Sequence, residues 1–242
     1  QNQEDDFQNG ISSRMKLQFD ANQQYQLDAV AAVTDLFDGQ PKGSPDFSII
    51  NMGYFDGLAA GQIRTDTGVG NRPLHSEDAL RENTRKIQER NDIETPSEKV
   101  PLEAWEIFDK VADKPRRCPH FSIEMETGTG KSYCYLRSIL ELSVRYGYLK
   151  FIIVVPSVAI REGVLKNIQI TAEHFRAIYN NLPYEHFVYD AKKIHRLRQF
   201  AVSNTLQIGI INIQAFNKKD SAVIYKESDR LWGMQPIEFI QT

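Results

Sequence analysis

The chain has 242 residues, of which 41% are hydrophobic, 10% aromatic and 25% charged. This composition is that of a globular protein, and it excludes a fully disordered chain, a collagen and a disulfide-stapled miniprotein. The formal net charge of −3 excludes a generally basic nucleic-acid-binding coat, but not a local basic groove. Cys118 and Cys134 show no zinc-ligand spacing, so we interpret both as reduced thiols of a cytoplasmic protein. No apolar run approaches the ~18–20 residues that cross a bilayer, and no membrane association is expected.

The first predicted element is a helix over 21–38, where apolar side chains recur at helical spacing. Gly39 and Pro41 are expected to end it. Residues 40–73 are rich in Gly, Asn, Asp and Pro, which favours loops. The strand-like run at 47–50 suggests a hairpin within them.

Two further helices are predicted before residue 113. The stretch 76–90 is highly charged and predicts a surface helix with Ser76 as its N-cap. A short helix is predicted over 102–112, and the following residues, 113–119, are expected to form a loop.

From residue 120 onward, strands and helices alternate. The run at 151–155 is unbroken and apolar, which is typical of a strand buried on both faces of a parallel sheet. This alternation predicts a doubly wound, mostly parallel α/β sheet with its strand-to-helix turns along one edge, where ligands bind. Strands are expected at 120–125, 151–155, 186–189 and 206–213, and helices at 131–146, 158–178 and 191–202.

The motif with the clearest chemistry is the sequence METGTGKS at 125–132, between a predicted strand and a predicted helix. Gly128 and Gly130 allow the backbone to turn so that successive amides point inward. Those amides and the helix N-terminus favour a phosphate group. Lys131 offers an ammonium group to the β- and γ-phosphates, and the Ser132 hydroxyl is placed to ligate Mg²⁺.

One position departs from the standard phosphate-binding loop. The pattern GxxxxGK[ST] requires glycine where this chain has Met125. The competing interpretation is a Gly-Thr turn before a helix that carries Lys-Ser by chance. A dinucleotide fold is disfavoured because no GxGxxG opens this helix.

The sequence TGTGKS after an apolar strand resembles motif I of superfamily-two helicases, in which the first glycine is often replaced. The longer stretch at 121–166 resembles the restriction (Res) subunit of type III restriction-modification enzymes. Similar segments flank it at 17–30, 71–91 and 211–218, so the resemblance covers most of 15–218.

The resemblance implies a P-loop NTPase fold of RecA-like type, namely an incomplete first helicase lobe. It also implies the domain organisation: an N-terminal extension at 1–14, an ATP-binding domain at 15–242, and an insertion at 39–118 before the P-loop. The implied cofactors are ATP and Mg²⁺. Lys131 and Ser132 are the implied catalytic residues, and Ser132 is the implied metal ligand. The residues implied to contact nucleotide are Gln26, Glu126, Thr127, Gly128, Thr129, Gly130, Lys131 and Ser132.

Gln26 matches the glutamine of the family's Q motif. A carboxamide has both a donor and an acceptor, so it can pair with adenine and select ATP. The alternatives are a helix-surface glutamine, or Gln23 or Gln24 in its place. Phe19 and Tyr25 are the two candidates to stack on the adenine ring. The alternative for either side chain is a place in the hydrophobic core.

The resemblance also implies contacts with a nucleic-acid strand, by Ser157 and Arg161 in motif Ia and by Gln214 in a later motif. The simpler interpretation of the first two is an N-cap and a solvated arginine. The basic run at 192–198 is a second candidate border of a DNA path, although a solvated helix face is the simpler interpretation.

ATP hydrolysis in this class uses an Asp-Glu pair after a strand, and no Asp-Glu dipeptide occurs in the chain. We therefore expect this motif, the second lobe and a nuclease domain beyond Thr242, and we interpret the chain as an N-terminal piece that alone hydrolyses ATP hardly at all. The full-length function implied is an ATP-dependent type III restriction endonuclease acting on double-stranded DNA with a methyltransferase (Mod) partner. The alternatives are another superfamily-two helicase or translocase, and a non-hydrolysing nucleotide-binding module.

Overall fold

The structure is a computed structural model of the whole chain. The residues it describes are 18–43, 46–54, 63–71, 73–94, 102–109, 114–216, 223–228, 231 and 235–241. The predicted extension at 1–14 lies outside the described residues.

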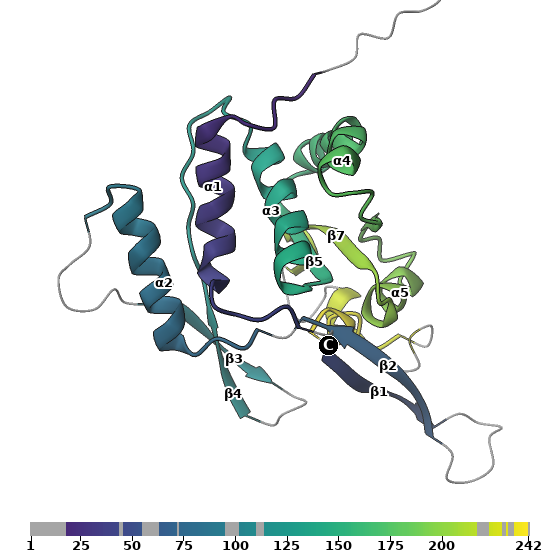
Figure 1. Cartoon of the computed structure of the whole chain (residues 1–242). Coiled ribbons are helices and arrows are strands. Elements are labelled where there is room, and N and C mark those ends of the chain that lie inside the picture. Colours follow the sequence, from purple (N-terminus) through teal and green to yellow (C-terminus); the bar gives the residue numbers. More distant parts are fainter. Residues whose placement is uncertain are drawn as a thin grey trace, which may run out of the picture.

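A three-stranded parallel sheet forms the centre of the fold (Figure 1). Its strands are β5 (Lys150–Val155), β6 (Tyr184–Val188) and β7 (Leu206–Asn212), in the order β5-β7-β6. Helix α4 (Val158–Ile178) connects β5 to β6, and α5 (His195–Val202) connects β6 to β7. The first connection passes over β7 from β5 to β6, and the second returns in the opposite direction from β6 to β7. Because both crossovers are right-handed, α4 and α5 lie on opposite faces of the sheet.

Each face of the sheet contacts its own hydrophobic core, as the alternation along β7 shows. Leu206, Ile208 and Ile210 are fully buried in the core that contains α4. On the other face, a Cβ on Gly209 would lie 3.2 Å from the ring of Phe187, which packs with α5. Burial on both faces accounts for the mostly apolar sequence of β7, LQIGIIN. The run at 151–155 in β5, where the sequence predicted such burial, is less buried, and Val154 is 49% exposed. The architecture is therefore the doubly wound α/β fold that the sequence predicted.

Two more helices complete the first core. Helix α3 (Lys131–Tyr146) follows the glycine-rich loop, and α1 (Gln24–Thr34) lies beside it (Figure 1). A 3₁₀ turn at Asp35–Phe37 follows α1, and Gly39 then adopts a left-handed conformation with a φ of 89°. The helix predicted over 21–38 therefore begins at Gln24, later than expected, while its end before Gly39 is confirmed.

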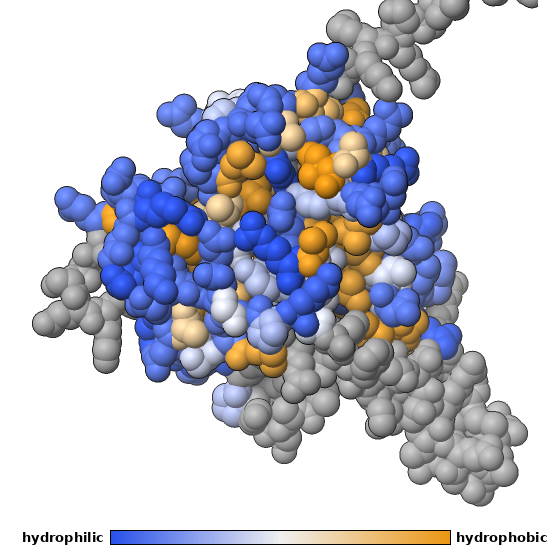
Figure 2. Space-filling view, in the orientation of Figure 1, coloured by the Kyte–Doolittle hydropathy of each residue, from blue (hydrophilic) through white to orange (hydrophobic). Residues whose placement is uncertain are grey.

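Residues 39–118 contain two hairpins and one helix in their described parts. The first hairpin pairs β1 (Asp46–Tyr54) with β2 (Ile63–Gly70), as predicted. Helix α2 (Glu77–Arg90) has a hydrophilic outer face (Figure 2). Its predicted N-cap is confirmed, because the Ala79 amide donates to Ser76 Oγ at 3.2 Å.

The predicted helix over 102–112 is wrong. Residues Ala104–Asp109 form strand β3, and Lys114–Pro119, predicted as a loop, form its antiparallel partner β4. Aromatic and β-branched residues in β3 favour a strand once a partner is present. The two prolines of β4 are tolerated because β4 pairs with β3 alone among the described strands.

The predicted strand over 120–125 is also absent from the described structure. These residues are outside any strand, and Phe121 and Ile123 are 40% and 48% exposed. The apolar alternation is present, but no described strand pairs with it. A strand requires a hydrogen-bonded neighbour, which sequence alone does not supply.

The predicted helices over 131–146 and 158–178 are confirmed at both ends, while α5 begins at His195, after the predicted residue 191. Asp190 explains the delay, since its carboxylate accepts the Lys192 amide at 2.9 Å and forms a turn there. The last described elements are 3₁₀ turns at Ile213–Phe216 and Val223–Tyr225 and helix α6 (Glu238–Gln241). Within the described ranges, no helix has the length and apolar character to span a membrane.

Candidate nucleotide-binding site

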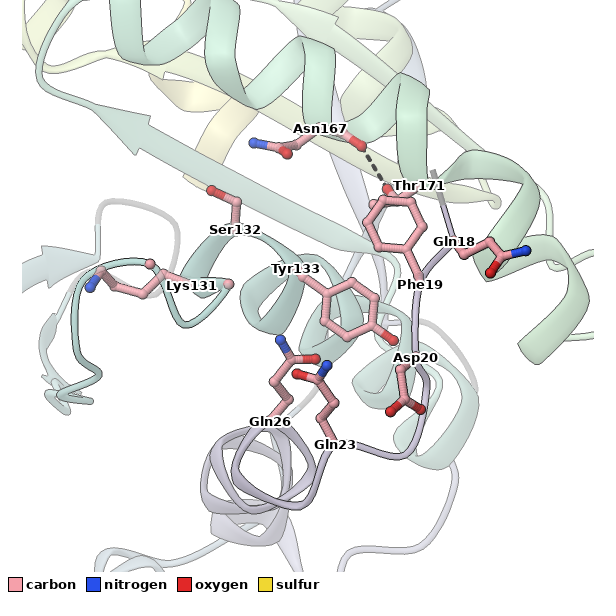
Figure 3. A pocket seen from close by; sticks show the side chains of 12 residues that line it. Gln18, Phe19, Asp20, Gln23, Gln26, Lys131, Ser132, Tyr133, Asn167 and Thr171 are labelled. Carbon is pink, nitrogen blue, oxygen red and sulfur yellow. Dashed lines mark hydrogen bonds between the residues drawn. The ribbon is translucent and has the colours of Figure 1, made fainter. Parts of the chain in front are cut away.

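A cavity of about 490 Å³ lies at the N-terminal end of α3 (Figure 3). This volume is within the ~300–1,000 Å³ range of small-molecule sites. Its walls come from four parts of the chain: the segment before α1 together with α1, the glycine-rich loop, the first turn of α3, and the middle of α4. The lining residues are Gln18, Phe19, Asp20, Gln23, Gln26, Gly128, Gly130, Lys131, Ser132, Tyr133, Asn167 and Thr171.

The loop takes the turn that its glycines predict. Gly128 and Gly130 have φ values of 86° and 89°, in the left-handed region that favours glycine. Gly130 is also the N-cap of α3. Thr129 Oγ1 donates to the carbonyl of Glu126 at 2.7 Å and closes the turn. The sequence from Glu126 to Thr129 therefore forms a compact, internally bonded turn.

The start of α3 presents donors that the helix itself does not use. The first intrahelical bond runs from the Cys134 amide to the Gly130 carbonyl at 3.0 Å, so the amides of Lys131, Ser132 and Tyr133 precede it. The Lys131 ammonium is exposed and donates to the carbonyls of Met125 and Glu126 at 2.8 Å each. In Figure 3 its side chain runs along the loop, away from Gln23 and Gln26. This arrangement concentrates positive charge and free amides at one point, which favours an anion.

Gln26 is buried and contacts the loop itself. Its Nε2 donates to the Thr129 carbonyl at 3.0 Å, and a Cβ on Gly130 would lie 2.6 Å from the same atom. Gln26 thus holds the loop in place, in addition to lining the cavity. A side chain at position 130 would therefore have to displace the end of Gln26 and would also adopt the left-handed φ that favours glycine.

An aromatic wall closes the cavity on the side away from Lys131. The rings of Phe19 and Tyr133 are stacked with centroids 6.1 Å apart, and His174 of α4 lies 5.3 Å from Phe19. Tyr133 Oη lies 2.9 Å from His174 Nε2. Burial, followed by the nearby Arg137 charge, lowers the pKa of His174, and burial raises the pKa of Tyr133. Tyr25 is 50% exposed and does not line the cavity, so of the two candidate stacking residues only Phe19 is in place.

The donor set at the loop fits a phosphate better than it fits a metal alone. Ser132 lines the cavity, and Asp20 is the only carboxylate among the described residues that line it. The Asp20 carboxylate also accepts the Asn22 amide at 2.9 Å. A hydroxyl and loop amides suit a magnesium–phosphate complex in which the phosphates supply other oxygen ligands.

A second cavity of about 660 Å³ lies at the carboxyl ends of β6 and β7. Two of the three predicted nucleic-acid-binding residues, Arg161 and Gln214, line it, together with Lys193 and Arg196 near the start of α5. Lys193 and Arg196 are exposed and form no ion pair among the described residues. Arg161, in contrast, is paired with Glu162 at 2.8 Å. The available positive charge therefore comes chiefly from the basic run before and within α5.

Ser157 does not line the second cavity. It is the N-cap of α4, with its Oγ accepting the Ile160 amide at 3.3 Å. Gln214 lies beside it, because its Nε2 donates to the Pro156 carbonyl at 2.8 Å. The structure thus brings together the ends of β5 and β7, where Ser157 and Gln214 were predicted to act.

Several residues of the first cavity were not found by sequence reasoning. Asn167 and Thr171 of α4 line the cavity, and His174 of the same helix packs on Phe19 and Tyr133 beside it. The place of all three depends on packing of α4 against α3. Arg137 is 8% exposed and contacts Tyr133. An arginine four residues after Tyr133, in a helix whose buried side chains are mostly apolar, is a signal that sequence reasoning missed.

The fold and the loop define the class of protein: a doubly wound α/β domain with a glycine-rich loop at the N-terminus of a helix. A sequence model of the family "Type III restriction enzyme, res subunit" matches residues 75–234. The chain belongs to this family.

Curated relatives carry the same description. The chain is 44% identical over 64 residues, 26% of its length, to the Res subunit of StyLTI from Salmonella typhimurium. It is 44% identical over 59 residues, 24% of its length, to the Res subunit of EcoP15I from Escherichia coli. It is 35% identical over 99 residues, 40% of its length, to the Res subunit of EcoPI from Escherichia phage P1. The aligned segments cover 6%, 6% and 9% of the respective relatives, so less than a tenth of each relative's length is matched by this chain.

Proposed function

We propose that this chain is the ATP-binding motor lobe of a type III restriction endonuclease. In this proposal ATP hydrolysis drives translocation or switching on double-stranded DNA, and a nuclease domain elsewhere in the subunit then cleaves. The observation that carries the proposal is the loop from Gly128 to Ser132, with two left-handed glycines, free amides and an exposed ammonium at a cavity. We further propose that residues 15–242 form one lobe and 39–118 its insertion, and that the protein acts in the cytoplasm with a methyltransferase (Mod) subunit.

The loop's residues then have distinct tasks. The amides at the start of α3 bind phosphate oxygens, and Lys131 exchanges its carbonyl partners at Met125 and Glu126 for the β- and γ-phosphates. The backbone from Glu126 to Gly130 forms the wall of the phosphate site. Ser132 is the residue that would hold Mg²⁺, which when bound neutralises charge on the phosphates. Gln26 fixes Thr129 and leaves its Oε1 as an acceptor for the adenine amino group.

The test is nucleotide binding by Lys131→Ala. Removing the ammonium is expected to weaken Mg-ATP binding by about 100-fold, or ~2.7 kcal/mol, with little change in thermal stability because Lys131 is exposed. Isothermal titration calorimetry measures this. Lys166→Ala is the matched control, since Lys166 is an exposed lysine of α4 that lines neither cavity. Equal ATP affinity in wild type and Lys131→Ala would refute the proposal.

We propose that the DNA strand lies over the ends of β5 and β7, at Ser157 and Gln214, and continues into the second cavity at Arg161. Exposed cations without partners favour phosphate contacts, which depend steeply on salt. Lys193 and Arg196 are the exposed cations that support this path. DNA binding that does not change with salt would refute it.

A non-hydrolysing nucleotide-binding module is the second candidate, and one observation favours it for this chain alone. The 242 residues contain no Asp-Glu dipeptide, and within the part of the chain that the structure describes Asp20 is the only carboxylate that lines the first cavity. We therefore expect Mg-ATP binding without robust DNA-stimulated hydrolysis. A phosphate-release assay on the purified chain distinguishes the two, because rapid DNA-stimulated release would show that the chain carries the whole catalytic machinery.

A further inference from the structure

Arg137 is a buried cation without a carboxylate partner in the described part of the chain. It is 8% exposed, on the side of α3 that faces the segment before α1. A buried guanidinium is costly unless its donors are satisfied. Its Nη1 donates to the carbonyl of Ala21 at 2.7 Å and to Tyr133 Oη at 3.3 Å. The contact with a backbone carbonyl 116 residues away ties two distant parts of the chain together.

The segment that Arg137 holds is a wall of the first cavity. Gln18, Phe19, Asp20 and Gln23 all line the cavity, and Ala21 lies in the middle of them. The segment makes two other kinds of contact. The Asn22 amide donates a hydrogen bond to Asp20 within the segment, and the Phe19 ring packs on Tyr133 and His174. The hydrogen bond from Arg137 to the Ala21 carbonyl therefore attaches this segment to α3, the helix that begins at the glycine-rich loop.

The same guanidinium also fixes the ring on which Phe19 packs. Arg137 lies 5.9 Å from the centroid of the Tyr133 ring. Because Arg137 donates to Tyr133 Oη, the Tyr133 hydroxyl proton is free to be donated to His174 Nε2, 2.9 Å away. One side chain thus orients both the aromatic ring and the backbone segment opposite the loop.

We propose that Arg137 is a positioning residue that shapes the part of the cavity for the base and sugar of the nucleotide, while the loop alone binds the phosphates. This inference rests on the proposed function, because it concerns the same nucleotide. Arg137 does not itself line the cavity, so it acts through Phe19, Tyr133 and the backbone at Ala21.

The test compares Mg-ATP with Mg-tripolyphosphate, which has the phosphates but no base. Arg137→Met retains the volume and removes the donors. We expect its ATP affinity to fall about tenfold, or ~1.4 kcal/mol, while its tripolyphosphate affinity remains within about twofold of wild type. Arg137→Lys retains one donor for the Ala21 carbonyl, so its ATP affinity is expected to lie between those of wild type and Arg137→Met. If Arg137→Met does not fold, the same comparison of ligands is made with Arg137→Lys.

Arg145→Met is the matched control. Arg145 is on the same helix and is paired with Asp35 at 3.0 Å and Glu141 at 3.4 Å, but it lines neither cavity. Both affinities are expected to be unchanged in this variant. The inference is overturned if Arg137 variants bind ATP as wild type does, or if they lose ATP and tripolyphosphate equally. If wild type binds neither ligand, the proposed function itself fails and this inference fails with it.

Discussion

Two lysines in this molecule make the same kind of contact in different surroundings. Lys131 donates to the carbonyls of Met125 and Glu126 in the glycine-rich loop. Lys150, at the start of β5, donates to the carbonyls of Phe200 and Ser203 at the C-terminal end of α5. Lys131 is exposed, whereas burial lowers the pKa of Lys150 to about 8.

The difference shows that exposure, more than hydrogen bonding, decides what a lysine can do. The Lys150 ammonium caps the last turn of α5 and lies 5.5 Å from the Phe200 ring centroid. Its contacts therefore stabilise the fold. Lys131 is exposed to solvent, and in the proposed function it exchanges its carbonyl partners for the nucleotide phosphates. The burial of each lysine, rather than its carbonyl partners, therefore distinguishes the two.

Among the variants that test this comparison, the largest effect on Mg-ATP affinity is expected from Gly130→Ala, which alters the loop that holds Lys131. An alanine there adopts a left-handed φ at a cost of ~1–2 kcal/mol and also displaces Gln26, 2.6 Å from the new Cβ. We expect Mg-ATP affinity to fall by more than about tenfold. Gly128→Ala has a similar φ but open space around its Cβ, so its loss should be smaller.

Gly163→Ala is the control for both glycine variants. Gly163 is in α4, with nothing within 4 Å of a Cβ. Its replacement should leave affinity unchanged and raise the free energy of unfolding by up to ~1 kcal/mol. If Gly130→Ala binds ATP as well as Gly163→Ala does, the phosphate site does not depend on the loop's backbone, and the comparison of the two lysines loses its basis.

A smaller effect is expected at two other exposed cations. Lys193 and Arg196, like Lys131, are exposed, and they form no ion pair among the described residues. The double variant Lys193→Ala/Arg196→Ala should reduce the slope of log affinity for double-stranded DNA against log salt by up to ~1.8, about 0.9 for each lost phosphate contact. Fluorescence anisotropy over a salt series measures the slope, and an unchanged slope would exclude these side chains from the DNA path. Lys166→Ala is again the control.

The smallest effect is the pH dependence of stability that Lys150 contributes. Its pKa of about 8 lies below its ordinary value of 10.5, so the unfolded chain binds the proton more tightly. Stability should therefore rise with pH between about 8 and 10.5, since the folded state disfavours the charged form. Lys150→Met should remove this rise, whereas Lys131→Met should retain it. Chemical denaturation at pH 8 and pH 9.5 measures the difference, and an identical rise in both variants would contradict the comparison.

Local sequence patterns were sufficient for much of the fold. The helix over 131–146 begins where the glycines end, and the helix over 158–178 begins after Pro156 and the Ser157 cap. In both cases the starting signal and the apolar spacing agree, so tertiary contacts do not change the outcome. The glycine turn was predictable for the same reason, since few local structures other than a tight turn favour two closely spaced glycines.

Patterns failed where an element depends on a partner far away in the chain. The sequence of β3 has helical features at Trp105 and Phe108, but its conformation is decided by β4. The residues at 120–125 show the opposite error, an apolar alternation without a described neighbour. Phe19 was a predicted candidate to stack on the base, but its neighbours were missed for the same reason. Tyr133, Arg137 and His174 are brought together with it only by the packing of α3, α4 and the segment before α1.

Helix α4 borders both cavities. Arg161 and Leu165 line the second cavity, and Asn167 and Thr171 line the first. At a rise of about 1.5 Å per residue, Arg161 and Thr171 are ~15 Å apart along one uninterrupted axis. A packed helix shifts as a unit, so an occupant that displaces it at one end changes the shape of the recess at the other. Thermodynamic reciprocity then requires that the two occupants alter each other's equilibrium affinity by the same factor.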